Sequence, residues 1–439
     1  MNRVVLLSIV ASTALLATNG DVMIGHGSKS SAMGGVGIAV SHGAESALSN
    51  PAMIKSLEAS EFTGSVTMFA PNVEFASNAG ANAMPAEAGG AYPNSAPTTY
   101  QKSTFDFSVI PDFSYATRIN DSIVTGLTID GTAGLGVDYK GKQRSGAFDM
   151  QTELSIAKMG IPVAYTIPNS GVTLGVEAIM QYSTLEINYN TPQGPSSNAK
   201  ATSTDFGFEL GASYDIGDFT LGAVYQSELK ANYKNNISSA MRDFGITGVK
   251  SGDNLDQPAE TGVGISYHKG ASTIGIDYRS IHWEDSAGYS DFGWKDQDVF
   301  AIGYRYEAKD WVFRTGYNHG KSPVKELNAR AGGTEGYENS AINFFNLSGF
   351  PAIVEDHITI GGDYRLAKNL DLSLAYVYSP ETEETFDTTG MTGGMVMQGA
   401  MANGATQEQA GQAASQAQPS TASTKHSQQA LTLGATYRF

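Results

Sequence analysis

Apolar and polar residues alternate along most of this chain, most clearly in its last ten residues. Leu431, Leu433 and Ala435 fall on one face of an extended strand with Tyr437 and Phe439, and the residues between them are small or polar. A period of two is typical of a β-strand with one apolar face. The pattern therefore predicts that the chain ends in a strand, and that this strand ends on an aromatic side chain.

The same alternation recurs in about fourteen segments from Glu61 onward, and we expect each to be a strand. The segments are 61–75, 104–119, 122–139, 151–167, 172–189, 203–216, 219–233, 259–269, 272–283, 294–308, 311–320, 354–366, 371–380 and 425–439. After the N-terminus, no apolar run approaches the ~18 residues of a membrane-spanning helix.

The connections between these segments alternate between short turns and long loops. Short turns on one side and long loops on the other are typical of outer-membrane barrels, with the short turns in the periplasm. The fold class predicted is all-β, an antiparallel transmembrane β-barrel of about 14 strands at residues 61–439. Such a barrel lies in the bacterial outer membrane, in contact with lipid and lipopolysaccharide, and its last strand engages the barrel-assembly machinery. The ordinary last strand of a soluble β-protein is the alternative.

The alternation also assigns side chains to the two faces of the wall. Aromatic residues gather beside the short turns, as in the girdle of a membrane barrel; they are Tyr165, Tyr214, Phe219, Tyr267, Tyr306, Trp311, Tyr364 and Tyr437. The predicted inward face holds charged residues: Glu177, Glu209, Glu228, Lys230, Asp277, Arg279, Arg305, Arg314, Asp363 and Arg365.

The N-terminal sixty residues differ from the rest. Residues 1–20 fit a signal peptide, with Arg3, an apolar stretch and then small residues, which predicts export. Residues 21–60 are rich in glycine, alanine and serine, and small residues allow close backbone packing. We expect this segment to be a hatch (plug) inside the barrel, with a disordered periplasmic arm as the alternative.

Composition agrees with this assignment. The chain has 439 residues, 50 glycines, no cysteine and a formal charge of −17. An exported chain without cysteine has no disulfides, so closure must come from the sheet. The acidic balance argues against nucleic acid as a partner.

Two long loops are unusual. Residues 381–424 are of low complexity, and we expect them to be mobile and extracellular, like the similar loop at 77–103. Apolar residues at Phe344, Phe345, Leu347, Phe350 and Ile353 are unlike a water-exposed loop. They are expected to tuck into the barrel mouth or dip toward lipopolysaccharide, unless they pack only within the loop.

Three stretches together resemble the FadL family of outer-membrane transporters. The first runs from Ser31 to Ala39 and continues with Asn50-Pro51-Ala52, which is similar to the family's hatch signature. The second spans Trp294 to Val324, with Gly303-Tyr304-Arg305-Tyr306 and Trp311-Val312-Phe313-Arg314. The third is Phe350-Pro351-Ala352-Ile353 followed by His357 to Gly361.

The resemblance implies a fourteen-stranded barrel that takes up hydrophobic molecules, either long-chain fatty acids or aromatic hydrocarbons. In the family, the ligand binds in the lumen, the hatch moves, and an inward kink of the third strand opens a lateral exit. Gly131 and Gly134 are our candidates for such a kink, since strand glycines often mark bends. This chain lacks the proline and the aromatic residue that the family usually has there.

The turn at Lys309-Asp310 sets Arg305 opposite Arg314 on the inward face. Like charges directly opposed are unfavourable unless something compensates for them, and arginine matches carboxylates well. A ligand carboxylate between them is one explanation. An ion-pair network with Glu307, Asp277 or Asp363 is the other. Lys158 and Arg279 are further candidates for substrate binding.

Nothing in the sequence indicates catalysis. None of the seven histidines lies in a nucleophile motif, there is no Gly-x-Ser-x-Gly, and the spacing for a metal site is absent. We expect no enzyme, no cofactor and no metal. A general porin and a surface adhesin or receptor remain as rivals to the transporter, and the sequence leaves the choice between fatty acid and hydrocarbon open.

Overall fold

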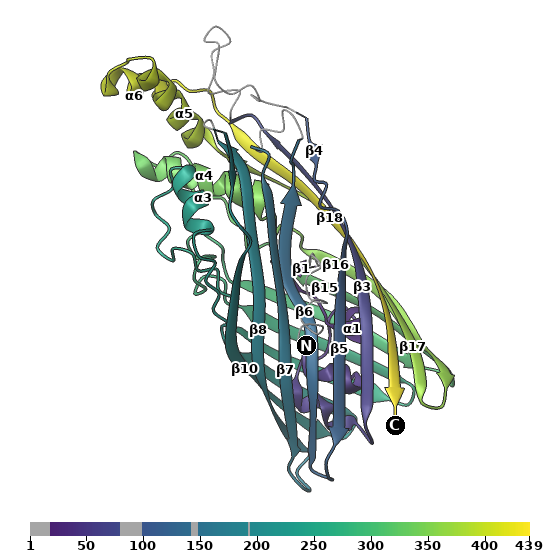
Figure 1. The fold of residues 1–439 in the computed structure, drawn as a ribbon. Helices are drawn as coiled ribbons and strands as arrows, with labels where there is room; N and C mark the ends of the chain where they lie inside the picture. The colour runs from purple at the N-terminus through teal and green to yellow at the C-terminus, as the bar shows by residue number, and fades with distance from the viewer. Residues whose placement is uncertain (1–17, 80–98, 142–147, 192–193) are drawn as a thin grey trace, which may run out of the picture.

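A computed structural model of the chain describes residues 18–79, 99–141, 148–191 and 194–439. Its eighteen strands form one sheet, in which fourteen long antiparallel strands close into a barrel (Figure 1). The prediction of a fourteen-stranded barrel is thus confirmed. The long strands are β3 (Glu61–Ser77), β5 (Ser108–Arg118), β6 (Ile123–Asp138), β7 (Gln151–Thr166), β8 (Val172–Thr191), β10 (Ala201–Ile216), β11 (Phe219–Gln226), β12 (Glu260–Lys269), β13 (Ser272–Ile281), β14 (Gln297–Glu307), β15 (Trp311–Gly320), β16 (Asp356–Ala367), β17 (Leu370–Asp387) and β18 (Thr421–Arg438).

The last strand closes the barrel. β18 pairs with β3 along its whole length, from Ala422 opposite Ser77 to Arg438 opposite Glu61. Threonine hydroxyls strengthen this seam on the inward face, where Thr67 and Thr432 are 2.8 Å apart. Closure leaves no unpaired edge along β18, which is what allows a sheet to stand in lipid. Two short strands, β4 (Gln101–Lys102) and β9 (Gly194–Ser197), only extend hairpins.

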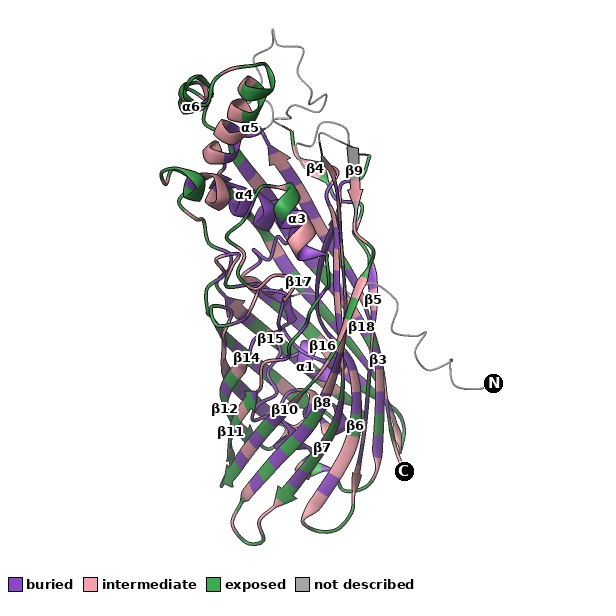
Figure 2. Ribbon diagram, turned by 60° about the vertical axis from the view of Figure 1, so that its left-hand side comes forward, coloured by how far each residue is buried: buried purple, intermediate pink, exposed green. Residues whose placement is uncertain are grey.

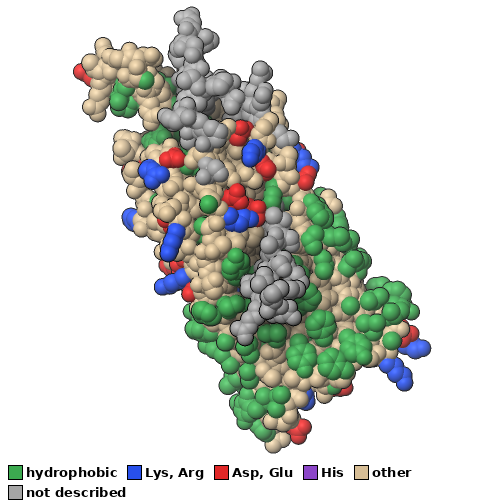
Figure 3. Space-filling view, in the orientation of Figure 1, with side chains coloured by type: hydrophobic (Ala, Val, Ile, Leu, Met, Phe, Trp, Pro, Cys, Tyr) green, Lys and Arg blue, Asp and Glu red, His purple; other side chains and the backbone are tan. Residues whose placement is uncertain are grey.

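The two faces of the wall differ as the alternation predicts. Exposed and buried residues alternate along the lower part of the strands (Figure 2), and hydrophobic side chains gather over the lower part of the surface in Figure 3. The expected girdle is exposed at Trp311, Tyr306 and Tyr437. The prediction that Lys230 faces inward is wrong, because this side chain is exposed. The strand β11 ends at Gln226, so the alternation does not continue to Lys230, and Leu229 is buried instead.

The long loops carry helices. α3 (Ile237–Asp243), α4 (Thr334–Gly349), α5 (Thr389–Ala402) and α6 (Gln407–Ser415) lie at the end opposite the short turns (Figure 1). Within the 381–424 loop, β17 extends to Asp387, two helices follow, and β18 begins at Thr421. The Ala, Met and Gln residues of this loop favour helix, and Thr406 with Gln409 forms a capping box. Residues 80–98 of the other loop lie outside the described residues.

Among the described residues, no helix is long and apolar enough to cross a lipid bilayer.

The N-terminal segment lies inside the barrel (purple in Figure 1). It contains β1 (Thr18–Asn19), β2 (Val22–Met23), α1 (Gly27–Ser31) and two 3₁₀ helices, η1 (Gly43–Leu48) and η2 (Pro51–Ser56). Almost all of its residues are buried. We call residues 18–57 the hatch. The predicted signal peptide lies mostly outside the described residues, which begin at Thr18.

Glycines in the wall make room for the hatch. On nine strands, an added Cβ would point at hatch atoms, and we call these residues the glycine belt: Gly175, Gly211, Gly222, Gly264, Gly275, Gly303, Gly316, Gly361 and Gly434. At Gly316, a Cβ would lie 2.2 Å from the carbonyl carbon of Met33. At Gly211, it would lie 2.1 Å from Oδ1 of Asn50. At Gly175, Gly222 and Gly316, the hatch backbone thus lies closer to the wall than a side chain at these positions would allow.

We predict that Gly316→Ala loosens the hatch and leaves the barrel folded. The added methyl group meets backbone, which cannot rotate away, and overpacking of this kind typically costs ~1–3 kcal/mol. Limited proteolysis should cut the hatch faster in the variant, while the heat-induced gel shift of the folded barrel is kept. Gly64→Ala is the matched control, because its Cβ meets only the side chains of Phe113 and Phe62. Equal cleavage of the two variants would contradict the role of the belt.

Candidate functional site: a lumen with two zones

Asp277 of β13 fixes the hatch through its backbone. Its Oδ2 accepts hydrogen bonds from the N–H groups of Gly37 (2.7 Å) and Ile38 (2.9 Å), and its side chain is buried. Hydrogen bonds to a carboxylate are stronger than those between neutral groups. Within the hatch, burial and the nearby Arg314 lower the pKa of His42 well below its usual range, so its neutral ring pairs with the carbonyl oxygen of Val36 at 2.7 Å.

The Asn50-Pro51-Ala52 stretch joins the hatch to the wall. Oδ1 of Asn50 accepts the N–H of Ala52 (3.0 Å) and so caps η2, while Pro51 occupies the first turn. Nδ2 of Asn50 donates to the carbonyl oxygens of Ile38 (2.8 Å) and of Ala212 on β10 (3.3 Å). One side chain therefore orders the hatch and ties it to the barrel.

The two predicted arginines do face each other, but each has a protein partner. Arg305 and Arg314 are register partners. Arg314 pairs with Asp363 at 2.6 Å with both side chains buried, and Arg305 pairs with Glu307 at 3.0 Å. Arg305 also donates to the carbonyl oxygen of Ser41 in the hatch (2.9 Å). Because protein groups already compensate their charge, we assign no ligand to this pair.

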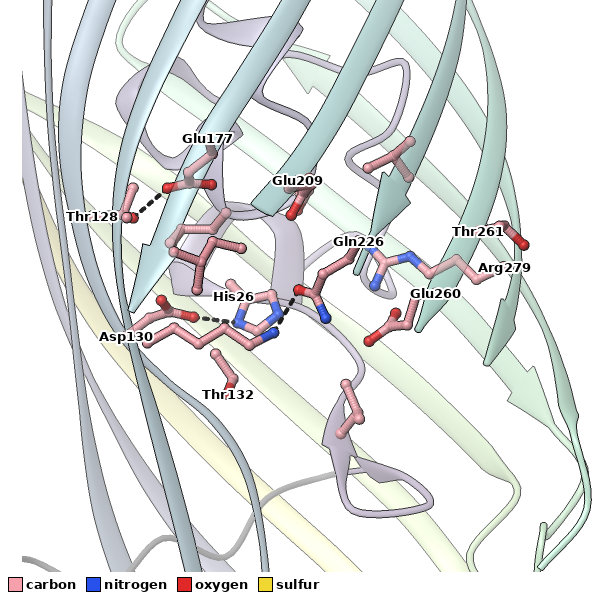
Figure 4. Close-up of a pocket in the computed structure, with 17 residues that line it drawn as sticks. His26, Thr128, Asp130, Thr132, Glu177, Glu209, Gln226, Glu260, Thr261 and Arg279 are labelled. Atoms are coloured by element: carbon pink, nitrogen blue, oxygen red, sulfur yellow. Dashed lines mark hydrogen bonds and ion pairs between the residues drawn. The ribbon is translucent and has the colours of Figure 1, made fainter. Parts of the chain in front are cut away.

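Lys158 and Arg279 lie elsewhere, beside a cavity that the hatch and the barrel wall line together (Figure 4). We call it the polar chamber and define it by its charged and amide residues: His26, Asp130, Lys158, Glu177, Glu209, Gln226, Glu260 and Arg279. Its free volume is about 50 Å³, enough for a few water molecules. Sites for drug-sized ligands measure ~300–1,000 Å³. A ligand must therefore displace side chains or the hatch to bind here.

The chamber is held by a few direct contacts. His26 pairs with Asp130 (Nδ1 to Oδ2, 3.1 Å), and Nζ of Lys158 donates to Oε1 of Gln226 at 2.6 Å. Glu177 accepts a hydrogen bond from the Thr128 hydroxyl at 2.6 Å. Within the described part of the chain, neither Lys158 nor Arg279 forms an ion pair. The positive charges of these two side chains are therefore not compensated by an ion pair among the described residues.

Above the chamber, the lumen is filled by aromatic side chains. We call them the mouth cluster: Phe75, Tyr139, Trp283, Tyr289, Phe292, Trp294, Phe344, Phe345 and Phe350. Their rings pack in edge and tilted contacts, for example Trp283 with Trp294 at 5.0 Å between centroids. Helix α4 supplies Phe344 and Phe345. The apolar loop residues noted in the sequence therefore lie inside the barrel mouth.

Wall contacts hold α4 there. The hydroxyl of Thr152 on β7 donates to the carbonyl oxygen of Gly349 (2.6 Å), and that of Thr424 on β18 donates to that of Leu347 (2.7 Å). These are two of the last carbonyl groups of the helix, which need partners when buried. The loop is thus fixed to the inner surface of the barrel.

The mouth cluster forms an apolar zone and the polar chamber forms a charged zone. The two zones meet at one level of the barrel wall. Along β7, the inward residues change from the apolar Leu154 and Ile156 to Lys158. Along β13, they change from Ile281 to Arg279. An apolar zone therefore lies directly against a charged one, and Val22 of the hatch contacts both.

The wall is interrupted beside the chamber. Pairing between β5 and β6 ends at Asp112 and Asp130, and a register shift falls between Gly131 and Ala133. Beyond it, Ala133 pairs with Val22 of the hatch instead of β5. Gly134 donates its N–H to the carbonyl oxygen of Asp21 at 3.0 Å. The two predicted kink glycines thus flank the point where the hatch replaces a barrel strand.

Asp21 connects this point to the extracellular loops. Its carboxylate accepts hydrogen bonds from the hydroxyl of Tyr289 and from Nε2 of Gln257 (3.2 Å). Burial raises the pKa of Asp21 from 3.8 to about 6, and the two donors lower it in part. Tyr289 belongs to the mouth cluster, so one carboxylate joins the hatch to the aromatic zone.

The amino-acid sequence matches a known family of outer-membrane proteins. The sequence model of the family described as "Outer membrane protein transport protein (OMPP1/FadL/TodX)" matches residues 5–274. The chain belongs to this family. The family is one of outer-membrane transporters of hydrophobic compounds, which supports the outer membrane as the location and a transport channel rather than an enzyme.

Single relatives agree with the family. A long-chain fatty acid transport protein of Escherichia coli O6:H1 is 24% identical over 330 residues, which are 63% of this chain and 71% of that protein. The crystal structure of a Pseudomonas aeruginosa FadL homologue superposes with a TM-score of 0.68 at 16% identity, covering 96% of this chain and 100% of that one. The P. putida toluene transporter TodX gives 0.61 at 16%, covering 95% and 99%. These two structures show the fold.

Sequence reasoning missed the chamber as a unit. It placed Glu177, Glu209 and Arg279 on the inward face but did not join them, and it gave no part to His26, Asp130 or Asp21. The available signal was the strand register, since Asp130 and Lys158 are direct partners across β6 and β7. Across the described residues, no group of three histidine or carboxylate side chains has the arrangement of a metal site.

We predict that the contact of Asp21 with Tyr289 and Gln257 stabilises the hatch more at low pH than at neutral pH. The native pKa lies above the ordinary value, so the native state binds more protons between pH 4 and 6, and its stability falls as pH rises through that range. A change from 3.8 to about 6 corresponds to ~3 kcal/mol. Hydrogen exchange of the hatch amides, corrected for intrinsic rates, should show stronger protection at pH 5 than at pH 7.5.

Asp21→Asn removes the titrating group and keeps its shape. The variant should lose most of this pH dependence. Asp256, a loop carboxylate whose pKa burial also raises to about 6, remains in both proteins and serves as an internal reference. The assignment fails if wild type and variant respond to pH alike.

Proposed function

We propose that this chain takes up long-chain fatty acids through the outer membrane. The observation that carries the proposal is the contact between an apolar zone and a charged zone in one lumen. An amphipathic ligand needs both, with its alkyl chain among the rings of the mouth cluster and its head group in the polar chamber. The relative from E. coli that carries long-chain fatty acids supports the same substrate class.

The proposed route follows the contacts. The ligand is captured at the mouth beside α4, and its chain enters the mouth cluster while the head group reaches the chamber. Because the chamber holds only a few water molecules, occupation displaces hatch residues such as Val22 and His26. Val22 pairs with Ala133 at the interruption of the wall. Its displacement would open the gap between β5 and β6 toward the membrane.

Aromatic hydrocarbons are the second candidate. The mouth cluster is rich in aromatic rings, and a hydrocarbon needs only an apolar pocket. The toluene transporter TodX shares the fold. A charged chamber next to the apolar zone has no use in carrying toluene, which is why we place fatty acids first. A general porin fits poorly, because the hatch fills the lumen.

We predict that blocking the boundary between the zones blocks uptake. Ile156 is 2% exposed and lies next to the chamber on the inward face of β7, whereas Ile161 is 57% exposed and lies on the outer face of the same strand. In cells without a transporter of their own, Ile156→Trp should lower saturable uptake of labelled oleate at least fivefold. Ile161→Trp, the matched control, should transport like wild type. Both variants must keep the gel shift of a folded barrel.

The same cells then receive labelled toluene. Saturable uptake of oleate but not of toluene supports the proposal. Toluene uptake alone moves the assignment to the second candidate. If wild type carries neither, or if both tryptophan variants lose uptake equally while folded, the lumen route is wrong.

A further inference from the structure

The polar chamber carries more negative than positive charge. Its lining has four carboxylates, on Asp130, Glu177, Glu209 and Glu260, against two cations, on Lys158 and Arg279. The formal difference is two negative charges, counting only these six side chains. An additional carboxylate from a ligand would enter this excess of negative charge. Like charges at close range in a water-poor site are unfavourable.

Two of the carboxylates stand directly opposite each other. Glu177 on β8 and Glu209 on β10 are register partners, and both point into the lumen (Figure 4). Oppositely placed like charges destabilise a sheet unless something lies between them. Thr128 donates to Glu177, but no described residue donates to Oε1 of Glu209, although Glu209 is only 7% exposed. A buried acceptor without a donor is costly.

Neither cation of the chamber, Lys158 or Arg279, donates a hydrogen bond to Oε1 of Glu209. Nζ of Lys158 donates to Gln226, and Nη2 of Arg279 is directed at the carbonyl oxygen of Gly35 at 3.4 Å. A group that brings a hydrogen atom, rather than a negative charge, is what the site lacks. The hydroxyl of an alcohol and the un-ionised form of a carboxylic acid both bring one.

We propose that the polar chamber accepts the ligand's head group as a hydrogen-bond donor to Glu209, so that a fatty acid binds as the neutral acid. The inference rests on the proposed function and narrows its substrate to alkyl chains with a donor head group. Binding involves no covalent step, and the proton of the acid comes from water before binding. The charged and titratable groups around Glu209 come from five strands and the hatch: Asp130, Lys158, Glu177, Glu260, Arg279 and His26.

The test compares three ligands of one chain length on the purified full chain. Dodecanol offers a donor, methyl dodecanoate offers only acceptors, and dodecanoic acid offers a donor only when neutral. Displacement of a fluorescent alkyl probe should show dodecanol binding at least tenfold tighter than the ester, at pH 5.5 and 8.0 alike. Dodecanoic acid should lose at least tenfold in affinity from pH 5.5 to 8.0, since the neutral fraction falls tenfold for each pH unit above its pKa.

A variant locates the effect. Glu209→Gln removes one negative charge and keeps the shape, so dodecanoic acid should gain at least fivefold in affinity at pH 8.0 and depend less on pH. Glu186→Gln, on the neighbouring strand β8 and outside the chamber, is the control and should behave as wild type.

Two outcomes separate the possible failures. If dodecanoic acid binds more tightly at pH 8.0 than at pH 5.5, or if Lys158→Gln abolishes its binding at pH 8.0 while Glu209→Gln changes nothing, the head group binds as a carboxylate and the inference is wrong. If none of the three ligands displaces the probe at either pH, the proposed function fails with it.

Discussion

The close approach of the hatch backbone to the barrel wall is the constraint on which the other features depend. A barrel of fourteen strands encloses more space than its own side chains fill, and in this chain the hatch fills the remainder. Glycines at Gly175, Gly211 and Gly316 let the hatch lie against the strands, and Asp277 fixes its backbone. Because the hatch is held by the wall, its strand β2 can take the place of β5 beside Ala133 of β6 and leave the wall interrupted beside the chamber.

The hatch also divides the lumen. Below the mouth cluster, it closes the polar chamber from the periplasmic side, and through Asp21 it contacts the loops that build the cluster. A ligand that enters the chamber must therefore displace side chains or the hatch, since the free volume of about 50 Å³ is too small for it. Substrate choice follows from the same geometry, because the apolar zone selects for a hydrophobic chain and the charge balance of the chamber decides which head group is tolerated.

Much of the fold could be predicted because a membrane barrel is specified by a local pattern. Period-two alternation gave the strand count and the closing strand, and the small residues of the N-terminus pointed to a hatch. The limits are equally physical. The ends of β11 and β17 depend on packing by loops, and helix α6 begins at a capping box that composition alone does not show. For the site, the hairpin turn placed Arg305 opposite Arg314. The choice of ion-pair partners, Glu307 for Arg305 and Asp363 for Arg314, depends on the three-dimensional structure. The chamber joins residues from seven strands and the hatch, so no local pattern contains it.

The central claim is that one amphipathic ligand spans both zones of the lumen. Anomalous diffraction from crystals of the full chain soaked with 12-bromododecanol tests it most directly, because the bromine marks the end of the alkyl chain. We expect a bromine peak among the rings of the mouth cluster near Phe345, with density for the hydroxyl in the chamber within hydrogen-bond distance of Glu209. Bromine only on the lipid-facing wall, or a ligand lying wholly outside the two zones, would contradict it.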